Sequence, residues 1–116
     1  MIKRSTRIRL EDILETLDGA GEIIDGVDFE AYKGNFEKRK ALERCVEIVS
    51  EATKHIPEAM KMEYPDSYWP EIKAIGNLLR HEYQRVDDRI LWRIAKIYFP
   101  ELRRVIADML SKSDPT

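Results

Sequence analysis

The stretch GNLLRHEYQRVD, at residues 76–87, has the spacing of an amphipathic helix, and the prediction of the whole fold starts from it. At about 100° per residue, apolar side chains recur on one face of this stretch and of the residues just before it. They are Ile72, Ile75, Leu79 and Val86. The opposite face collects polar side chains, which are Lys73, Asn77, Arg80, His81 and Gln84. We therefore predict a helix from about residue 69 to 85 that buries one face and presents the other.

Apolar residues at helical spacing predict further helices on both sides of this one. The expected ranges are about 7–25, 29–33, 36–55 and 88–110. Gly26 and Gly34 mark helix ends. Asp28 and Asn35 are typical N-cap residues. Pro100 is expected to kink or restart the last helix, because proline has no N–H to donate.

The composition also favours a helical fold. Of the 116 residues, 43% are apolar and 36% are charged, with only 5 Gly and 5 Pro. Many charges with few helix breakers favour helices over a turn-rich β fold. We predict an all-α, up-down four-helix bundle with an extra short helix, forming a single domain over residues 1–116. Residues 111–116 are expected to form a frayed tail.

Charge, cysteine content and hydropathy limit the functional classes. The formal net charge is −2, so no overall field attracts nucleic acid and any RNA contact must be local. The single cysteine, Cys45, lies among apolar residues and is expected to be a packed core thiol in a reducing compartment. No apolar run reaches the roughly 20 residues that span a membrane, so we expect no membrane partner and a cytoplasmic location.

The sequence has no pattern typical of a metal, cofactor or DNA site. Its two histidines, His55 and His81, are far apart, and no Cys/His cluster has the spacing of metal ligands. It also lacks a Gly-rich phosphate loop, a helix-turn-helix signature and a zinc finger. We therefore expect no metal, no cofactor and no DNA partner. His55, beside Pro57 near a helix end, is interpreted as solvated or as a C-cap.

The polar face of the central helix has the groups needed to cleave RNA without a metal. The 2′-OH of RNA must lose a proton and attack the adjacent phosphate, and a histidine titrating near neutral pH accepts such a proton. An arginine holds the phosphate and the charge that builds on it, and an amide holds a further oxygen. The candidates for these three roles are His81, Arg80 and Asn77.

Two of these candidates also have ordinary structural explanations. A helical histidine such as His81 is commonly a hydrogen-bonding group at a surface or an interface. Arg80 has a second interpretation as one half of an ion pair. The expected partners of that ion pair are Glu82, Asp87 or a partner chain.

The residues around this triad extend the candidate site. Tyr83 has one reading as a half-buried aromatic whose hydroxyl lies at the surface. Candidates for contacts with an RNA backbone are Lys73, Gln84 and Arg85. Basic runs of this kind are more often a solvated face paired with nearby carboxylates.

The motif residues resemble a known superfamily. Asn77, His81 and Tyr83, followed by Val86-Asp87 and Ile90-Leu91-Trp92, are similar to the HEPN superfamily. Within it, the sequence resembles the HepT-like ribonuclease toxins that are paired with a minimal nucleotidyltransferase (MNT) antitoxin. The resemblance extends over nearly the whole chain. It includes Glu51-Ala52, Tyr68-Trp69 and the run Phe99-Pro100-Glu101-Leu102.

This resemblance implies a fold, an activity and partners. It implies a small all-helical homodimer that cleaves RNA without metal, through 2′-OH attack at a composite dimer cleft. It implies the toxin component of a toxin–antitoxin system, with an MNT-type nucleotidyltransferase antitoxin that adenylylates (AMPylates) Tyr83. An adenylate there would add negative phosphate close to His81 and Arg80 and would repel RNA.

The sequence departs from the family pattern at one position. The residue before Asn77 is Gly76, where the family pattern has an arginine. Helical side chains lean toward the N-terminus, so Arg80 is expected to lie over the turn that contains Gly76. We therefore expect the Arg80 guanidinium to fill the volume of the absent arginine. The alternative is a catalytically inactive HEPN dimer that serves as a binding subunit for a nucleotidyltransferase partner.

Overall fold

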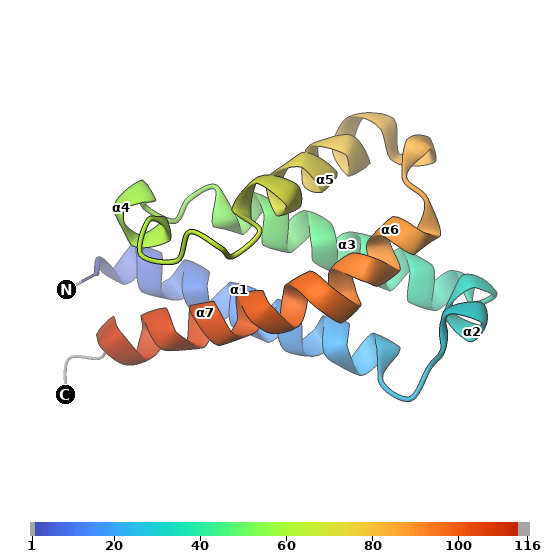
Figure 1. Ribbon diagram of the computed structural model, residues 1–116, viewed down its shortest axis with the longest axis horizontal. Coiled ribbons are helices and arrows are strands. Elements are labelled where there is room, and N and C mark those ends of the chain that lie inside the picture. Colours follow the sequence, from blue (N-terminus) through green and yellow to red (C-terminus); the bar gives the residue numbers. More distant parts are fainter. Residues whose placement is uncertain (1, 114–116) are drawn as a thin grey trace.

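The helices of the computed structural model form an all-α bundle, and the structure describes residues 2–113 (Figure 1). The helices are α1 (Arg4–Ile24), α2 (Phe29–Lys33), α3 (Phe36–Thr53), α4 (Glu58–Lys61), α5 (Trp69–Glu82), α6 (Asp88–Arg93) and α7 (Phe99–Ser113). A 3-10 turn, Tyr83–Arg85, follows α5, and a π-helical turn, Ile94–Tyr98, joins α6 to α7. The predicted fold class, an all-α bundle with short additional helices, is confirmed. No helix within the described residues is long and apolar enough to cross a membrane.

Helix α3 lies between two neighbours. It packs against α1 along one side and against α5 along the other, while α7 packs on α1 (Figure 1). The buried side chains recur at helical spacing, as the sequence predicts. Those of α1, α3 and α7 include Leu10, Ile13, Leu17, Leu42, Val46, Val49, Leu102, Val105 and Ile106. This core holds α3 and α5 in fixed positions, and the polar residues of interest lie where these two helices meet.

The π-helical turn gives the last helix a wider turn than the sequence predicts. Pro100 cannot donate a backbone hydrogen bond, and just before it the N–H of Phe99 donates to the carbonyl of Ile94, five residues back. The extra residue shifts the phase of the helix. Ile97, which lies within this turn, is 48% exposed although it is a large apolar residue.

Helix α5 starts from a strained residue that long-range contacts hold. Tyr68, its N-cap, has φ 57°, a left-handed conformation that costs free energy for any residue but glycine. Its ring stacks on Tyr98 with ring centroids 4.2 Å apart. The next residue, Trp69, donates from its indole N–H to the Tyr64 carbonyl at 3.0 Å. The Tyr64 hydroxyl in turn donates to Asp108 of α7 at 2.5 Å.

Three helix ends differ from the prediction. Helix α5 ends at Glu82, where the backbone leaves the helical region (φ −148°), rather than at about residue 85. Helix α3 ends at Thr53, two residues before the predicted end at residue 55, ahead of Pro57. Helix α7 continues through Ser113, so residues 111–113 are helical where a frayed tail was expected. The rest of that predicted tail, residues 114–116, lies outside the described residues.

Helices α3 and α5 approach each other closely at Ser50 and Gly76. A Cβ placed on Gly76 would lie 1.8 Å from Ser50 Oγ and 2.2 Å from Ser50 Cβ. Both residues are buried. Serine and glycine are small enough for the helix backbones to approach at this point, and no larger side chain fits at position 76 while Ser50 is present.

We predict that Gly76→Ala destabilises the protein, although alanine is the better helix former by roughly 1 kcal/mol. Overpacking against Ser50 is expected to cost about 1–3 kcal/mol, which outweighs that gain. Urea denaturation followed by circular dichroism measures the free energy of unfolding.

Gly19→Ala is the matched control, because a Cβ on this helical glycine meets nothing within 4 Å. It should stabilise by about 0.5–1 kcal/mol. In the double variant Ser50→Gly/Gly76→Ala, most of the overpacking cost should disappear, because the nearest remaining atom is the residue 50 Cα at 3.7 Å. Equal stabilisation by Gly19→Ala and Gly76→Ala would show that the contact is not tight.

Candidate functional site

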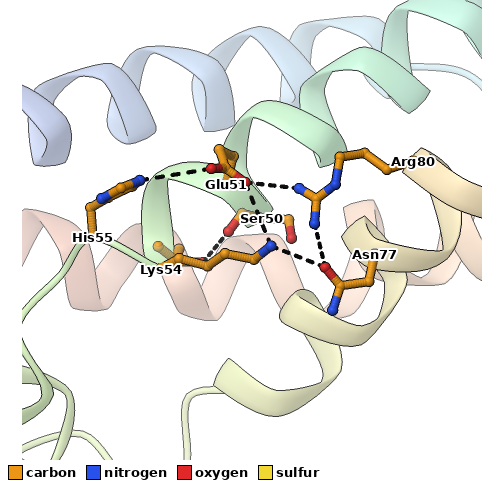
Figure 2. A network of polar contacts seen from close by, with 7 residues as sticks. Ser50, Glu51, Lys54, His55, Asn77 and Arg80 are labelled. Atoms are coloured by element: carbon orange, nitrogen blue, oxygen red, sulfur yellow. Dashed lines mark hydrogen bonds and ion pairs between the residues drawn. The ribbon is translucent and has the colours of Figure 1, made fainter.

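A network of polar side chains crosses the line where α3 meets α5, and the Glu51 carboxylate is at its centre (Figure 2). Arg80 reaches over from α5, with Nη1 2.8 Å from Glu51 Oε2. From the turn that follows α3, Lys54 Nζ lies 3.5 Å from Oε2, and His55 Nε2 lies 3.7 Å from Oε1. One carboxylate is thus shared by an arginine, a lysine and a histidine.

Asn77 also binds two of these cations, Lys54 and Arg80. Its Oδ1 accepts a hydrogen bond from Lys54 Nζ at 3.0 Å and another from Arg80 Nη2. Both neighbours are donors only, which fixes the orientation of the amide. The Asn77 NH₂ group therefore points away from the network, as Figure 2 shows. It remains a free donor beside the Arg80 guanidinium.

Helical spacing and the Ser50–Gly76 contact explain why these residues meet. Glu51, Lys54 and His55 are separated by three and four residues, so they share one face at the end of α3. Asn77 and Arg80 share a face of α5 in the same way. Because Ser50 and Gly76 bring the two backbones close, side chains one residue further on reach across from each helix.

Electrostatics favour the ionised form of Glu51. Loss of hydration raises the pKa of its carboxyl group, but Lys54, Arg80 and His55 together lower it by more. The pKa of Glu51 therefore lies below its usual value, and the carboxylate is charged at neutral pH.

A groove of about 610 Å³ runs beside this network over α3, between α1 and α5. Both basic and acidic side chains line it. The charged residues that line it are Arg9, Asp12, Arg44, Glu47, Glu51, Lys54 and Arg80. Within residues 2–113, no three His, Cys, Asp or Glu side chains are grouped so that they could hold a metal ion.

The structure brings two of the three predicted catalytic residues together. Asn77 and Arg80 are hydrogen bonded in the network. His81 lies on the exposed part of α5 and makes no hydrogen bond or ion pair within the described residues. Lys73 is also exposed on α5. The ion pair considered for Arg80 exists, but its partner is Glu51 of α3 rather than Glu82 or Asp87.

The predicted residues beyond Glu82 lie in the 3-10 turn, so they leave the face of α5 that carries Lys73. Tyr83 is 63% exposed rather than half-buried, with Lys40 Nζ 5.8 Å from its ring centroid. Gln84 is exposed. Arg85 is also exposed and pairs with Glu82 at 3.1 Å.

Sequence reasoning missed three members of the network. It used Glu51 only as part of a resemblance and assigned no role to Lys54. It interpreted His55 as solvated or as a C-cap, whereas the His55 side chain pairs with Glu51. The spacing of Glu51, Lys54 and His55 was the available signal, since an acid followed by bases three and four residues later pairs on a helix.

The geometry defines an all-helical protein with a mixed-charge site across two helices, and comparison with known proteins makes the assignment specific. The model of the family described as "Ribonuclease HepT-like" matches residues 13–109. The chain therefore belongs to the HepT-like ribonuclease family of the HEPN superfamily, as its resemblance predicted.

Relatives of similar length agree with this assignment. A protein of Thermococcus cleftensis named "Probable ribonuclease HepT" is 34% identical over 88% of this chain and 93% of its own length. A protein of Methanocaldococcus jannaschii, named as a candidate RNase, is 30% identical over 98% of both chains. Another from Caldanaerobacter subterraneus, also named as a candidate RNase, is 30% identical over 94% of this chain and 97% of its own. No solved structure matches the chain.

We predict that Arg80→Met raises the pKa of Glu51 toward its usual value, because the variant removes the cation 2.8 Å from the carboxylate. Carbon-13 NMR titration of the Glu51 carboxyl group measures this pKa. Arg104→Met is the control, since Arg104 pairs with Glu101 on α7.

The sign of the linked stability follows from the depressed pKa. Ionised Glu51 stabilises the fold above the carboxyl pKa of the unfolded chain, and this contribution is lost as pH falls through the lower, folded-state pKa. An Arg80→Met variant whose Glu51 titrates as in the wild type would contradict the ion pair.

Proposed function

We propose that this protein is a metal-independent endoribonuclease, the toxin of a toxin–antitoxin pair whose antitoxin is an MNT-type nucleotidyltransferase. The observation that carries the proposal is the family match over residues 13–109, within which Asn77 and Arg80 lie side by side and His81 follows directly. The names of the relatives support an RNA substrate.

The proposed reaction divides the chemistry among three residues. His81 takes the proton of the ribose 2′-OH, and the 2′-oxygen attacks the adjacent phosphorus. The bond to the 5′-oxygen breaks, this oxygen takes a proton from water, and the products are a 2′,3′-cyclic phosphate and a 5′-OH end. Arg80 stabilises the charge on the phosphate oxygens. The outward NH₂ group of Asn77 donates to a further oxygen.

The Glu51 ion pair sets the condition for RNA binding. Arg80 contacts Glu51 through Nη1 and Asn77 through Nη2, and a guanidinium has five N–H donors. A phosphate must therefore use the remaining donors of Arg80 or replace Glu51. The ion pair is partly exposed to solvent, where such pairs contribute little free energy, so the replacement has a low cost.

Arg80 supplies the cation that Gly76 lacks. Position 76 points into the contact with Ser50, so an arginine at this position would meet the Ser50 side chain at once. Arg80, one turn later, is hydrogen bonded to Asn77 and reaches Glu51, next to Ser50. We propose that its guanidinium does the work of the family's arginine.

The exposed position of His81 supports a composite site. Its side chain has no partner within the described residues, and it lies one residue from Arg80. In a two-fold homodimer with this face at the interface, both copies of His81 and Arg80 would line one cleft. We propose that RNA binds in this cleft.

We predict that His81→Ala and Arg80→Ala each lower kcat/KM for cleavage of single-stranded RNA by about 10²–10⁴-fold, since each removes a group that acts in the transition state. Cleavage is measured with a fluorophore–quencher RNA in EDTA. Arg104→Ala is the control. It removes an arginine that pairs with Glu101, three residues earlier on α7, and it should keep full activity.

A rescue variant tests the role assigned to Arg80. Ser50→Gly removes the side chain that blocks position 76, so Gly76→Arg combined with Ser50→Gly should restore part of the activity lost in Arg80→Ala. Full activity of Arg80→Ala alone would exclude Arg80 as the phosphate-binding residue.

We also propose that the partner nucleotidyltransferase inactivates the toxin by adenylylating Tyr83. The Tyr83 ring is 63% exposed, so its hydroxyl is accessible to an enzyme. The added phosphate would lie within a few residues of Arg80 and His81 and would compete with RNA for the cation.

We predict that co-expression with an MNT-type nucleotidyltransferase adds one or more AMP masses to the wild type and none to Tyr83→Phe, as measured by intact-protein mass spectrometry. The modified wild type should lose RNase activity. Unchanged labelling of Tyr83→Phe would place the modification elsewhere; Tyr64, whose hydroxyl is bonded to Asp108, is the comparison site.

A second candidate function is a catalytically inactive dimer that binds the nucleotidyltransferase. Gly76 in place of the family's arginine, together with the engagement of Arg80 by Glu51, favours this alternative. Expression of the chain alone separates the two functions. If the protein is a ribonuclease toxin, its expression arrests growth and His81→Ala relieves the arrest. If it is a binding subunit, neither the wild type nor His81→Ala arrests growth.

A further inference from the structure

Two exposed aromatic rings flank one lysine near the start of α3. Lys40 Nζ lies 5.5 Å from the ring centroid of Phe36 and 5.8 Å from that of Tyr83. Arg39 adds a second cation, with its guanidinium carbon 5.7 Å from the Phe36 centroid. We call this set, Phe36, Lys40 and Tyr83, the aromatic patch.

The exposure of the aromatic patch has no explanation in the packing. Phe36 and Tyr83 are each 63% exposed, whereas other aromatic residues such as Tyr32 and Phe99 are buried in the core. Phe36 is also not needed to start α3, because the Asn35 side chain caps that helix by accepting from the Lys38 N–H at 3.0 Å. A large exposed apolar ring beside a cation is typical of a binding surface.

The aromatic patch continues the groove described above. Lys40 and Glu51 are eleven residues apart on α3, which is about three turns, so they lie on the same face roughly 16 Å apart. Arg44 and Glu47 of the groove lie between them. Tyr83 is two residues beyond His81. A stacked strand that rises about 3.4 Å per nucleotide would cover this distance with about five nucleotides.

We propose that the aromatic patch is a base-stacking subsite for single-stranded RNA, whose backbone follows α3 toward Arg80. This inference rests on the proposed ribonuclease function. Exposed rings stack on bases of any sequence, and a cation between them neutralises the phosphates. Lys40 also pairs with Glu43 at 3.4 Å, which holds the ammonium group in place beside the rings. Phe36 would thus position RNA without touching the reacting atoms.

The chemistry of the aromatic patch favours RNA over a protein partner. The core of a protein–protein interface is depleted of charged residues, whereas here Lys40 lies between the two rings and Arg39 borders them. Base stacking needs only single ring faces with cations nearby. The patch would also explain how adenylylation of Tyr83 blocks RNA, because the attached adenine would stack on the Phe36 ring in place of an RNA base.

The test measures RNA binding by the full chain carrying His81→Ala, so that the RNA is not cleaved. The probes are a fluorescein-labelled oligo(A) of twelve nucleotides and an abasic oligomer of the same length and charge, compared by anisotropy at fixed salt. We expect Phe36→Ala to weaken oligo(A) binding by about five-fold or more, the loss of one stacked base, and to leave abasic binding unchanged.

Two variants of Tyr83 and one control variant separate stacking from other effects. Tyr83→Phe keeps the ring but removes the modifiable hydroxyl, so it should bind oligo(A) like its parent, whereas Tyr83→Ala should not. Met62→Ala is the control for loss of an exposed apolar side chain, because Met62 is 75% exposed and follows α4 at the other end of α3 (Figure 1). It should change nothing.

Three results would overturn the base-stacking subsite. They are equal binding of the two oligomers, no loss in Phe36→Ala, or a Phe36→Ala variant that turns a dimer into a monomer in light scattering, which would make the patch an interface between copies. Cleavage by the wild type is measured in parallel. Cleavage without base-dependent binding refutes only the subsite, and base-dependent binding without cleavage refutes only the ribonuclease function.

Discussion

The contact between Ser50 and Gly76 is the constraint on which the site depends. Polar side chains of two helices can bind each other across the helix interface only if the backbones approach closely. Here the approach is so close that a methyl group at position 76 would not fit. The consequence is functional as well as structural. Arg80 and Asn77 of α5 meet Glu51 and Lys54, at the end of α3, because Gly76 leaves only the small Ser50 side chain between the two backbones.

This constraint also gives physical meaning to the departure from the family pattern. An arginine at position 76 and a serine at position 50 cannot both be accommodated in this packing, so under the proposed function the cation comes from another position. Arg80 is one helical turn away and shares hydrogen bonds with Asn77. The electrostatic attraction between a cation and a phosphate depends on the distance between them in space, not on the position of the cation in the sequence.

Much of the fold followed from periodicity, and most of what did not follow depended on contacts distant in sequence. The range of α2 and the cap at Asn35 were predicted because they depend on neighbouring residues. The π-helical turn was not, since the apolar residues around it also fit the spacing of a regular α-helix. The site was predicted in part: the polar face of α5 was visible, but the pairing of Arg80 with Glu51 joins residues 29 apart.

The strained start of α5 has a consequence for when the site forms during synthesis. Tyr68 is held in its left-handed conformation by the ring of Tyr98, and the loop before it is tied to Asp108. A chain emerging from the ribosome from its N-terminus cannot make these contacts until its last helix is out. A nascent chain therefore carries Arg80 and His81 on a helix that can already pack on α3 but whose first residues are not yet held. The start of α5 is therefore fixed only after α7 has been synthesised.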